Sequence, residues 1–162
     1  MKRELQNVPA SVYDRLRTYA RERAEEVQLV HQRYAAERLL YRLAQSPYRG
    51  QFVLRGAMLY VLWGGEAYRA TGDLDLLGYG SPEPEEIQTC FRDLLTVGVP
   101  DDGLRFDPDA IRIRKVREDR EYSGVEVKLG LRLKTARILL KVDVGFGDVV
   151  VPGPEEGNRS RG

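Results

Sequence analysis

The chain has 162 residues, 42 % of them hydrophobic and 31 % charged, which is enough to build one ordinary domain with a sizeable core. Its single cysteine, Cys90, excludes an internal disulfide, and its single histidine, His31, leaves no material for a zinc site or a Ser-His-Asp triad. No apolar run approaches the ~18 residues of a membrane span, and the N-terminus lacks the apolar stretch of a signal peptide. We therefore expect a cytoplasmic protein without a membrane partner.

The net charge of +1 conceals a strong segregation of charge along the chain. Residues 1–49 carry ten Lys or Arg against six Asp or Glu, 73–109 carry ten acidic residues against two arginines, and 112–141 carry ten basic residues against four acidic ones. Solvated helix and strand faces would explain this pattern. An acidic cleft flanked by surfaces that attract a polyanion such as RNA would explain it equally well.

Hydrophobic periodicity predicts the order of the elements. Ser11 followed by Asp14 fits a helix N-terminal cap. The predicted elements are helices over about 11–25 and 28–45, a buried strand at 52–54, a buried helix at 57–63, a strand at 74–77, a helix over 83–96 with Cys90 in the core, and strands around 111–113, 125–134 and 138–144. This order predicts an α+β fold, a mixed sheet preceded by N-terminal helices.

In the strand over 125–134, Val125, Val127, Leu129, Leu131 and Leu133 alternate with Glu126, Lys128, Gly130, Arg132 and Lys134. Because successive side chains of a strand point to opposite faces, the first set is expected to be buried and the second solvated.

Gly56 separates the strand at 52–54 from the helix that follows. Glycine lets the backbone approach a ligand closely, and the start of the next helix presents unpaired N–H groups to an anion such as phosphate. An ordinary tight turn that binds nothing remains the alternative.

Asp73 and Asp75 flank Leu74 in the next strand. Residues i and i+2 of a strand point to the same side, so both carboxylates project together. Such a pair suits Mg²⁺ shared with substrate phosphates, although acids at a strand end also simply face water.

Asp143 lies within an otherwise apolar strand, on the face opposite Val142 and Val144. A buried carboxylate is costly without a partner, which indicates a cation or a structural hydrogen bond. If this strand lies beside the strand of Asp73, three acids converge and suffice for two metal ions. Asp148, which follows Gly147 in an expected loop, is the competing third acid. Three acids around metal indicate phosphoryl chemistry, in which Asp143 could also be the general base.

The chain resembles the nucleotidyltransferase toxins of the AbiEii/AbiGii type. The run from Phe52 through Gly56 to Leu59, the run from Tyr68 to Asp75, and the run from Lys141 to Asp148 carry the resemblance. It implies a DNA-polymerase-β-like nucleotidyltransferase core. Its metal-binding and catalytic residues are expected to be Asp73, Asp75 and Asp143, with Mg²⁺ or Mn²⁺ as the cofactor.

The resemblance also places a phosphate-binding turn at Gly56, Ala57 and Met58, where many members carry Gly-Gly-Ser or Gly-Gly-Thr and so a hydroxyl that this chain lacks. Arg55 and Arg69 are further candidates for contacts to phosphate or acceptor, because the planar guanidinium fork suits phosphate. Either arginine could equally pair with a core carboxylate.

The expected organisation is a nucleotidyltransferase domain at 1–154, with N-terminal helices at 11–47 and a catalytic core at 51–151, and a disordered tail at 155–162. The implied activity is transfer of a nucleoside monophosphate from a nucleoside triphosphate to an acceptor, such as a tRNA end or other RNA, by the toxin of a toxin–antitoxin or phage-defence system. A cognate antitoxin is the implied partner.

Family members continue into a helical C-terminal lobe that this sequence, ending at Gly162, does not include, and we expect a truncated member. A catalytically silent remnant that binds nucleotide or tRNA therefore stays open as an alternative. So does a structural domain whose acids only decorate its surface, although the apolar surroundings of Asp143 argue against it.

Overall fold

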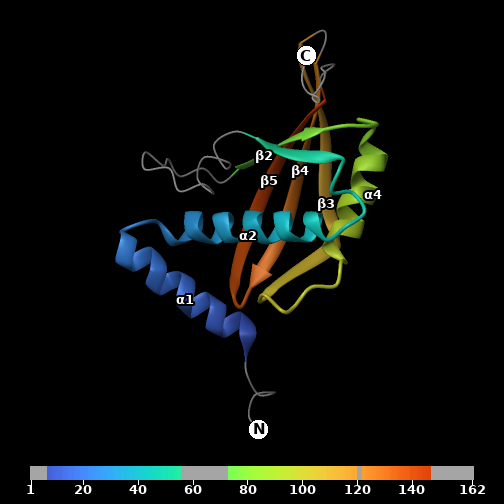
Figure 1. Ribbon diagram of the computed structural model, residues 1–162. Helices are drawn as coiled ribbons and strands as arrows, with labels where there is room; N and C mark the ends of the chain where they lie inside the picture. Colours follow the sequence, from blue (N-terminus) through green and yellow to red (C-terminus); the bar gives the residue numbers. More distant parts are fainter. Residues whose placement is uncertain (1–6, 56–72, 120–121, 147–162) are drawn as a thin grey trace.

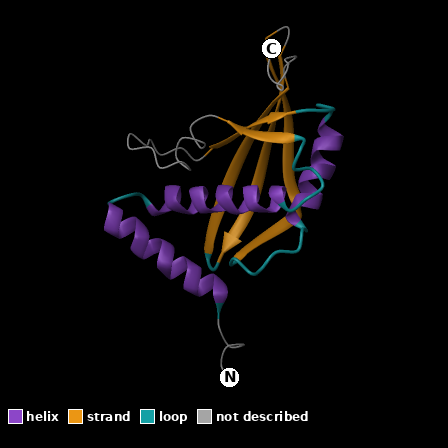
Figure 2. Cartoon of the chain, in the orientation of Figure 1, coloured by secondary structure: helices purple, strands orange, loops and turns teal. Residues whose placement is uncertain are grey.

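The computed structural model describes residues 7–55, 73–119 and 122–146. Helices and a single five-stranded sheet make up this part of the chain (Figure 1, Figure 2). The elements are α1 (Val8–Arg23), α2 (Val27–Ala44), β1 (Phe52–Arg55), β2 (Asp73–Gly78), α4 (Pro84–Leu95), β3 (Leu104–Asp119), β4 (Tyr122–Leu133) and β5 (Ala136–Phe146). None of the helices in the described ranges is long and apolar enough to cross a membrane.

The sheet has the strand order β1-β2-β5-β4-β3 and is mixed. Strands β2 and β5 pair in parallel, whereas the other three neighbouring pairs are antiparallel. Strand β5 therefore lies in the middle of the sheet, although it follows β4 in the chain. The structure confirms the α+β class and the mixed sheet.

One face of the sheet forms the core. The five apolar residues that alternate along β4 are all buried, as predicted, and so are Leu74 and Leu76 of β2 and Leu140, Val142 and Val144 of β5. Helix α2 crosses the sheet in Figure 1, with α1 and α4 to either side, and all three helices contact sheet strands. No described helix covers the opposite face, which we call the open face.

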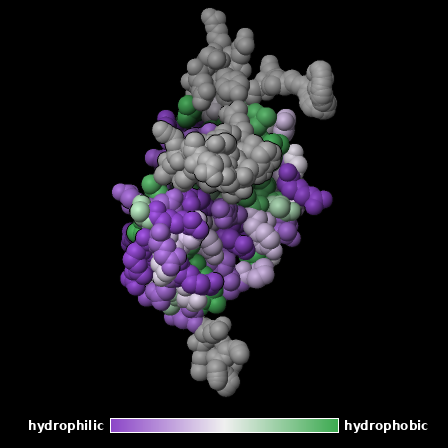
Figure 3. Space-filling view, turned by 60° about the vertical axis from the view of Figure 1, so that its left-hand side comes forward, coloured by the Kyte–Doolittle hydropathy of each residue, from purple (hydrophilic) through white to green (hydrophobic). Residues whose placement is uncertain are grey.

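Helix α1 begins earlier than the cap at Ser11 predicts. Asn7 is its N-cap, where the side chain accepts a hydrogen bond from the backbone N–H of Ala10 at 3.1 Å, and Pro9 stands in the first turn. Asparagine before an early proline is itself a helix-start signal, so the prediction at Ser11 was wrong for a reason visible in the sequence. The side of the molecule that carries α1 is mainly hydrophilic (Figure 3).

Two burial predictions were wrong and one was confirmed in part. In the short strand β1, predicted to be buried, Val53 is 46 % exposed, because it belongs to the open face. Cys90 packs against the core but is only half-buried, and its thiol lies 3.8 Å from Oε1 of Gln51. Glu126, expected on a solvated face, is buried at 7 % exposure.

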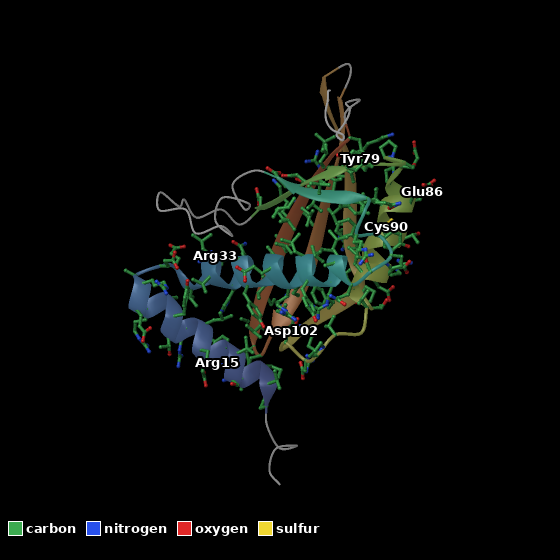
Figure 4. All side chains as sticks on the ribbon, in the orientation of Figure 1. Arg15, Arg33, Tyr79, Glu86, Cys90 and Asp102 are labelled. Atoms are coloured by element: carbon green, nitrogen blue, oxygen red, sulfur yellow. The ribbon has the colours of Figure 1, made fainter. Side chains whose placement is uncertain are left out.

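A buried ion cluster ties α2 to the start of β3. Asp102 accepts hydrogen bonds from Nη1 of Arg42 at 2.7 Å, from Nε of Arg38 at 2.9 Å and from the backbone N–H of Leu104 at 3.2 Å, while its carbonyl accepts from the hydroxyl of Tyr34 at 2.7 Å. Asp102 lies where α2 meets the loop before β3 (Figure 4). Burial alone would raise the pKa of Asp102, but the two arginines hold it below its ordinary value.

Candidate active site

Strands β2 and β5 bring the predicted acids together. Asp75 and Asp143 are direct partners in the parallel register of these strands, and Asp73 stands two residues before Asp75 on the same side of β2. Neighbouring strands lie about 4.8 Å apart, and residues i and i+2 of one strand are separated by about 6.6 Å. The three aspartates, separated in sequence by up to 70 positions, therefore share one small area of the open face.

The register extends this area into a row across the whole sheet. Arg55 of β1, Asp75 of β2, Asp143 of β5, Glu126 of β4 and Arg114 of β3 are successive cross-strand partners. We call the three carboxylates Asp75, Asp143 and Glu126 the acidic row.

The next row toward the N-terminal end of β2 begins with Asp73, followed by Lys141. The ammonium of Lys141 lies 3.8 Å from Oδ2 of Asp73 and 3.4 Å from Oε2 of Glu126. Arg114 contacts the other oxygen of Glu126, with Nε and Nη2 each 3.2 Å from Oε1. Glu126 therefore has a cation on each of its carboxylate oxygens, which explains how a charged group is buried here.

The electrostatics of the site favour an added cation. Partial burial raises the pKa of Asp143, and the negative charges of Asp73, Asp75 and Glu126 raise it further, while Lys141 opposes them. The charges of Asp73 and Asp143 and the hydrogen bond to Glu126 raise the pKa of Lys141. Burial would also raise the pKa of Glu126, but the hydrogen bonds and charges of Arg114 and Lys141, with the charge of Lys128, together hold the pKa below its ordinary value. A carboxyl whose charged form is disfavoured in this way gains from a divalent ion.

The side chains of the site suit a divalent metal in their chemistry. Asp73, Asp75 and Asp143 offer the oxygen ligands that Mg²⁺ and Mn²⁺ take, on adjacent strands and one face. As they stand in the structure, the described residues include no group of three or more acidic, histidine or cysteine side chains that could hold a metal ion. Among the described side chains, the ammonium of Lys141 lies beside Asp73.

Several predicted site residues lie outside the described ranges. Gly56, Ala57, Met58 and Arg69 belong to the segment between β1 and β2, and Asp148 follows β5. Of Arg55 only the backbone is described, and its register beside Asp75 places it at the acidic row.

Glu126 and Lys141 are functional candidates that the sequence pattern did not single out. Both stood in alternating strands, where a charged residue on the polar face is ordinary. The sequence did contain one indication of Lys141. It stands two residues before Asp143 in the same strand, so the two side chains lie on the same face. Only the pairing of β4 with β5 adds Glu126 to them.

Two hollows flank the site without containing it. A pocket of about 410 Å³ lies between α4 and the far end of β2, where Tyr79, Glu86 and Cys90 line it (Figure 4). A groove of about 580 Å³ lies farther along β4 and β5, with Gly130 and Leu139 among its lining residues. Arg105, Arg132 and Arg137, which are successive cross-strand partners, also line it.

A mixed sheet with helices on one face, and acids converging from two adjacent strands on the other, defines a nucleotidyltransferase-like fold. Comparison with protein families gives the same answer: the model described as "Nucleotidyl transferase AbiEii toxin, Type IV TA system" matches residues 38–158. The match covers more than half of the chain, so the chain belongs to the AbiEii nucleotidyltransferase toxin family. A comparison with curated proteins finds no match. Membership implies a nucleoside triphosphate as substrate and a cognate antitoxin as partner.

Proposed function

We propose that this protein transfers a nucleoside monophosphate from a nucleoside triphosphate to an RNA acceptor in a reaction that depends on Mg²⁺ or Mn²⁺. The observation that carries the proposal is the register of β2 and β5, which sets Asp143 directly beside Asp75 and on the same face as Asp73. Family membership supports the reaction class, and the geometry supports these three residues as its centre.

In this proposal Asp73, Asp75 and Asp143 would hold the metal. When bound, it would supply positive charge to neutralise phosphate and to lower the pKa of the attacking hydroxyl. Asp143, beside Asp75 in the sheet register, is also our candidate to accept the proton of that hydroxyl. Pyrophosphate then leaves in line with the attack.

Residues around the metal position the phosphates. Arg55 stands beside Asp75 in the sheet register, and Gly56, Ala57 and Met58, predicted to form a phosphate-binding turn, follow it in the sequence. Backbone N–H groups of such a turn and the guanidinium fork both suit phosphate oxygens. We assign Arg69 the same class of contact, to phosphate or acceptor.

The open face supports a polyanionic acceptor. Arg105, Arg132 and Arg137 are all exposed and form one row across three strands beside the groove. This row stands six residues from the acidic row along β4 and β5, about 20 Å at the rise of a strand. A strand of RNA that crosses the arginine row would have its end within reach of the aspartates, and phosphate contacts of this kind provide affinity without sequence specificity.

The test combines binding with transfer. The protein is incubated with labelled nucleoside triphosphate, total tRNA and Mg²⁺, and label on RNA is measured beside the melting temperature. We expect labelled RNA and a higher melting temperature, because a ligand of the native state stabilises it. Asp73→Asn should abolish both, whereas the matched control Asp109→Asn, an exposed aspartate in the irregular part of β3, should retain both.

The outcomes separate the candidate functions. A melting shift without labelled RNA would identify a silent binder of nucleotide, and the absence of both would leave a structural domain. Transfer retained by Asp73→Asn would refute the assignment of the site.

A further inference from the structure

Lys141 stands between two kinds of carboxylate. On one side is Asp73, with a side chain 48 % exposed and 3.8 Å from the ammonium. On the other is Glu126, with a side chain 9 % exposed and 3.4 Å from the ammonium. Exposed ion pairs contribute about 0–1 kcal/mol, so the pair with Asp73 is easily broken. The pair with Glu126 is shorter and its carboxylate is little exposed, although the Lys141 side chain is 36 % exposed, so this pair should be the more persistent of the two.

Glu126 is itself fixed from the far side. Arg114 occupies its Oε1, which leaves Oε2 toward Lys141. The carboxylate is thus held by β3 and offers one oxygen to β5, its neighbour in the sheet. A long flexible side chain such as that of Lys141 can turn about this contact without a change in the backbone.

We propose that Lys141 is the resident counter-ion of the aspartates, and that Glu126 is a positioning residue that keeps the ammonium beside the site while a divalent cation takes its place. This inference rests on the metal-dependent function proposed above. A divalent cation and the ammonium compete for Asp73, and the contact with Glu126 gives the displaced ammonium a partner. Lys141 then remains next to the acidic row, where it can face the phosphates of the substrate.

Mn²⁺ affinity, measured from the electron paramagnetic resonance signal of free Mn²⁺ without nucleotide, tests this competition. Lys141→Met removes the competitor, so Mn²⁺ should bind about two- to fivefold more tightly, the range that corresponds to the free energy of one exposed ion pair. Glu126→Gln releases the ammonium toward the aspartates, so Mn²⁺ should bind about twofold more weakly in the otherwise unchanged protein.

The double variant separates a positioning role from a direct one. When Lys141 is absent, Glu126→Gln should have less than half the effect on Mn²⁺ affinity that it has when Lys141 is present. Equal effects in both backgrounds would show that Glu126 acts on the metal without Lys141 and would overturn the inference. Lys128→Met, which removes the neighbouring cation of the same row, is the matched control and should change the affinity less than Lys141→Met.

The inference and the proposed function fail in different ways. If Mn²⁺ binds the unaltered protein and Asp143→Asn abolishes binding, but Lys141→Met leaves the affinity unchanged or weakens it, only the inference is wrong. If the unaltered protein binds no Mn²⁺, both are wrong. Should Glu126→Gln unfold the protein, Glu126→Asp replaces it, because the shorter side chain keeps the charge but withdraws the carboxylate from Lys141. The same weaker binding is expected, with the same loss of effect when Lys141 is absent.

Discussion

Two carboxylate clusters in this protein differ in charge balance. Asp102 is one buried acid met by two arginines, and its pKa is lowered. Around Asp73, Asp75 and Asp143 the described side chains include Lys141, which also pairs with Glu126, and the pKa of Asp143 is raised. In the first cluster the arginines favour the charged carboxylate, and the contacts stabilise the fold. In the second, burial and neighbouring carboxylates disfavour the charged form of Asp143, a condition that an added cation would relieve.

The strongest test of this contrast is the loss of one acid from each cluster, beginning with Asp143→Asn. It should reduce nucleotidyl transfer about a thousandfold, since a lost metal ligand removes several kcal/mol of transition-state stabilisation. Thermal stability without metal should stay the same or rise, because the substitution removes one of several neighbouring negative charges. Steady-state transfer assays and calorimetry measure the two quantities, and a large loss of stability would mean that Asp143 is a structural acid.

Asp102→Asn should show the opposite pattern. It leaves two arginines against a neutral side chain and should lower the free energy of unfolding by about 3 kcal/mol, as breaking a buried ion pair does. Mn²⁺ affinity of the folded fraction should not change, because Asp102 lies on the helical side of the sheet. Urea unfolding measures the loss; an unfolding free energy within about 0.5 kcal/mol of the original would show that the cluster contributes little.

The pH dependence of unfolding sharpens the assignment of Asp102. Because its pKa is lower in the folded protein than its ordinary value of 3.8, the carboxylate contributes stability that is present above pH 3.8 and is lost as the pH falls through the folded value. The unaltered protein should therefore lose stability more steeply below this pH than Asp102→Asn does. Parallel acid limbs in urea titrations of the two proteins would contradict the assignment.

Salt should give the smallest effect. Raising NaCl from 0.01 to 0.2 M shortens the screening length from about 30 Å to below 10 Å, which weakens repulsion among the exposed aspartates. Without divalent metal, the melting temperature should rise by a few degrees at most, and the rise should shrink in Asp75→Asn. An equal rise in Asp75→Asn would place the repulsion elsewhere on the surface.

The sequence predicted which residues form strands better than it predicted which strands pair with each other. Alternation along β4 is a local property with a period of two, so the buried set from Val125 to Leu133 could be identified directly. The convergence of the aspartates was a conditional prediction, because whether β5 lies beside β2 depends on contacts between segments about 70 residues apart. The structure confirms that pairing.

The burial of Glu126 could not be predicted in this way. Its position in the alternation indicates the polar face, which is where it lies, but its exposure depends on Arg114 and Lys141 on two other strands. The cluster around Asp102 was missed for the same reason, since α2 and the loop before β3 meet only in the folded protein. The roles assigned to Arg69 and to the turn at Gly56 stay predictions.

Because β5 lies between β2 and β4 in the sheet, the site can form only after β5 has been made. A ribosome makes β2 and β4 before β5, yet β5 must enter between them, so these two strands cannot be joined in one sheet until the later segment has emerged. Loop closure over such a span is entropically costly and is completed late. Asp75 and Asp143 therefore meet only after β5 has been made and has paired with β2.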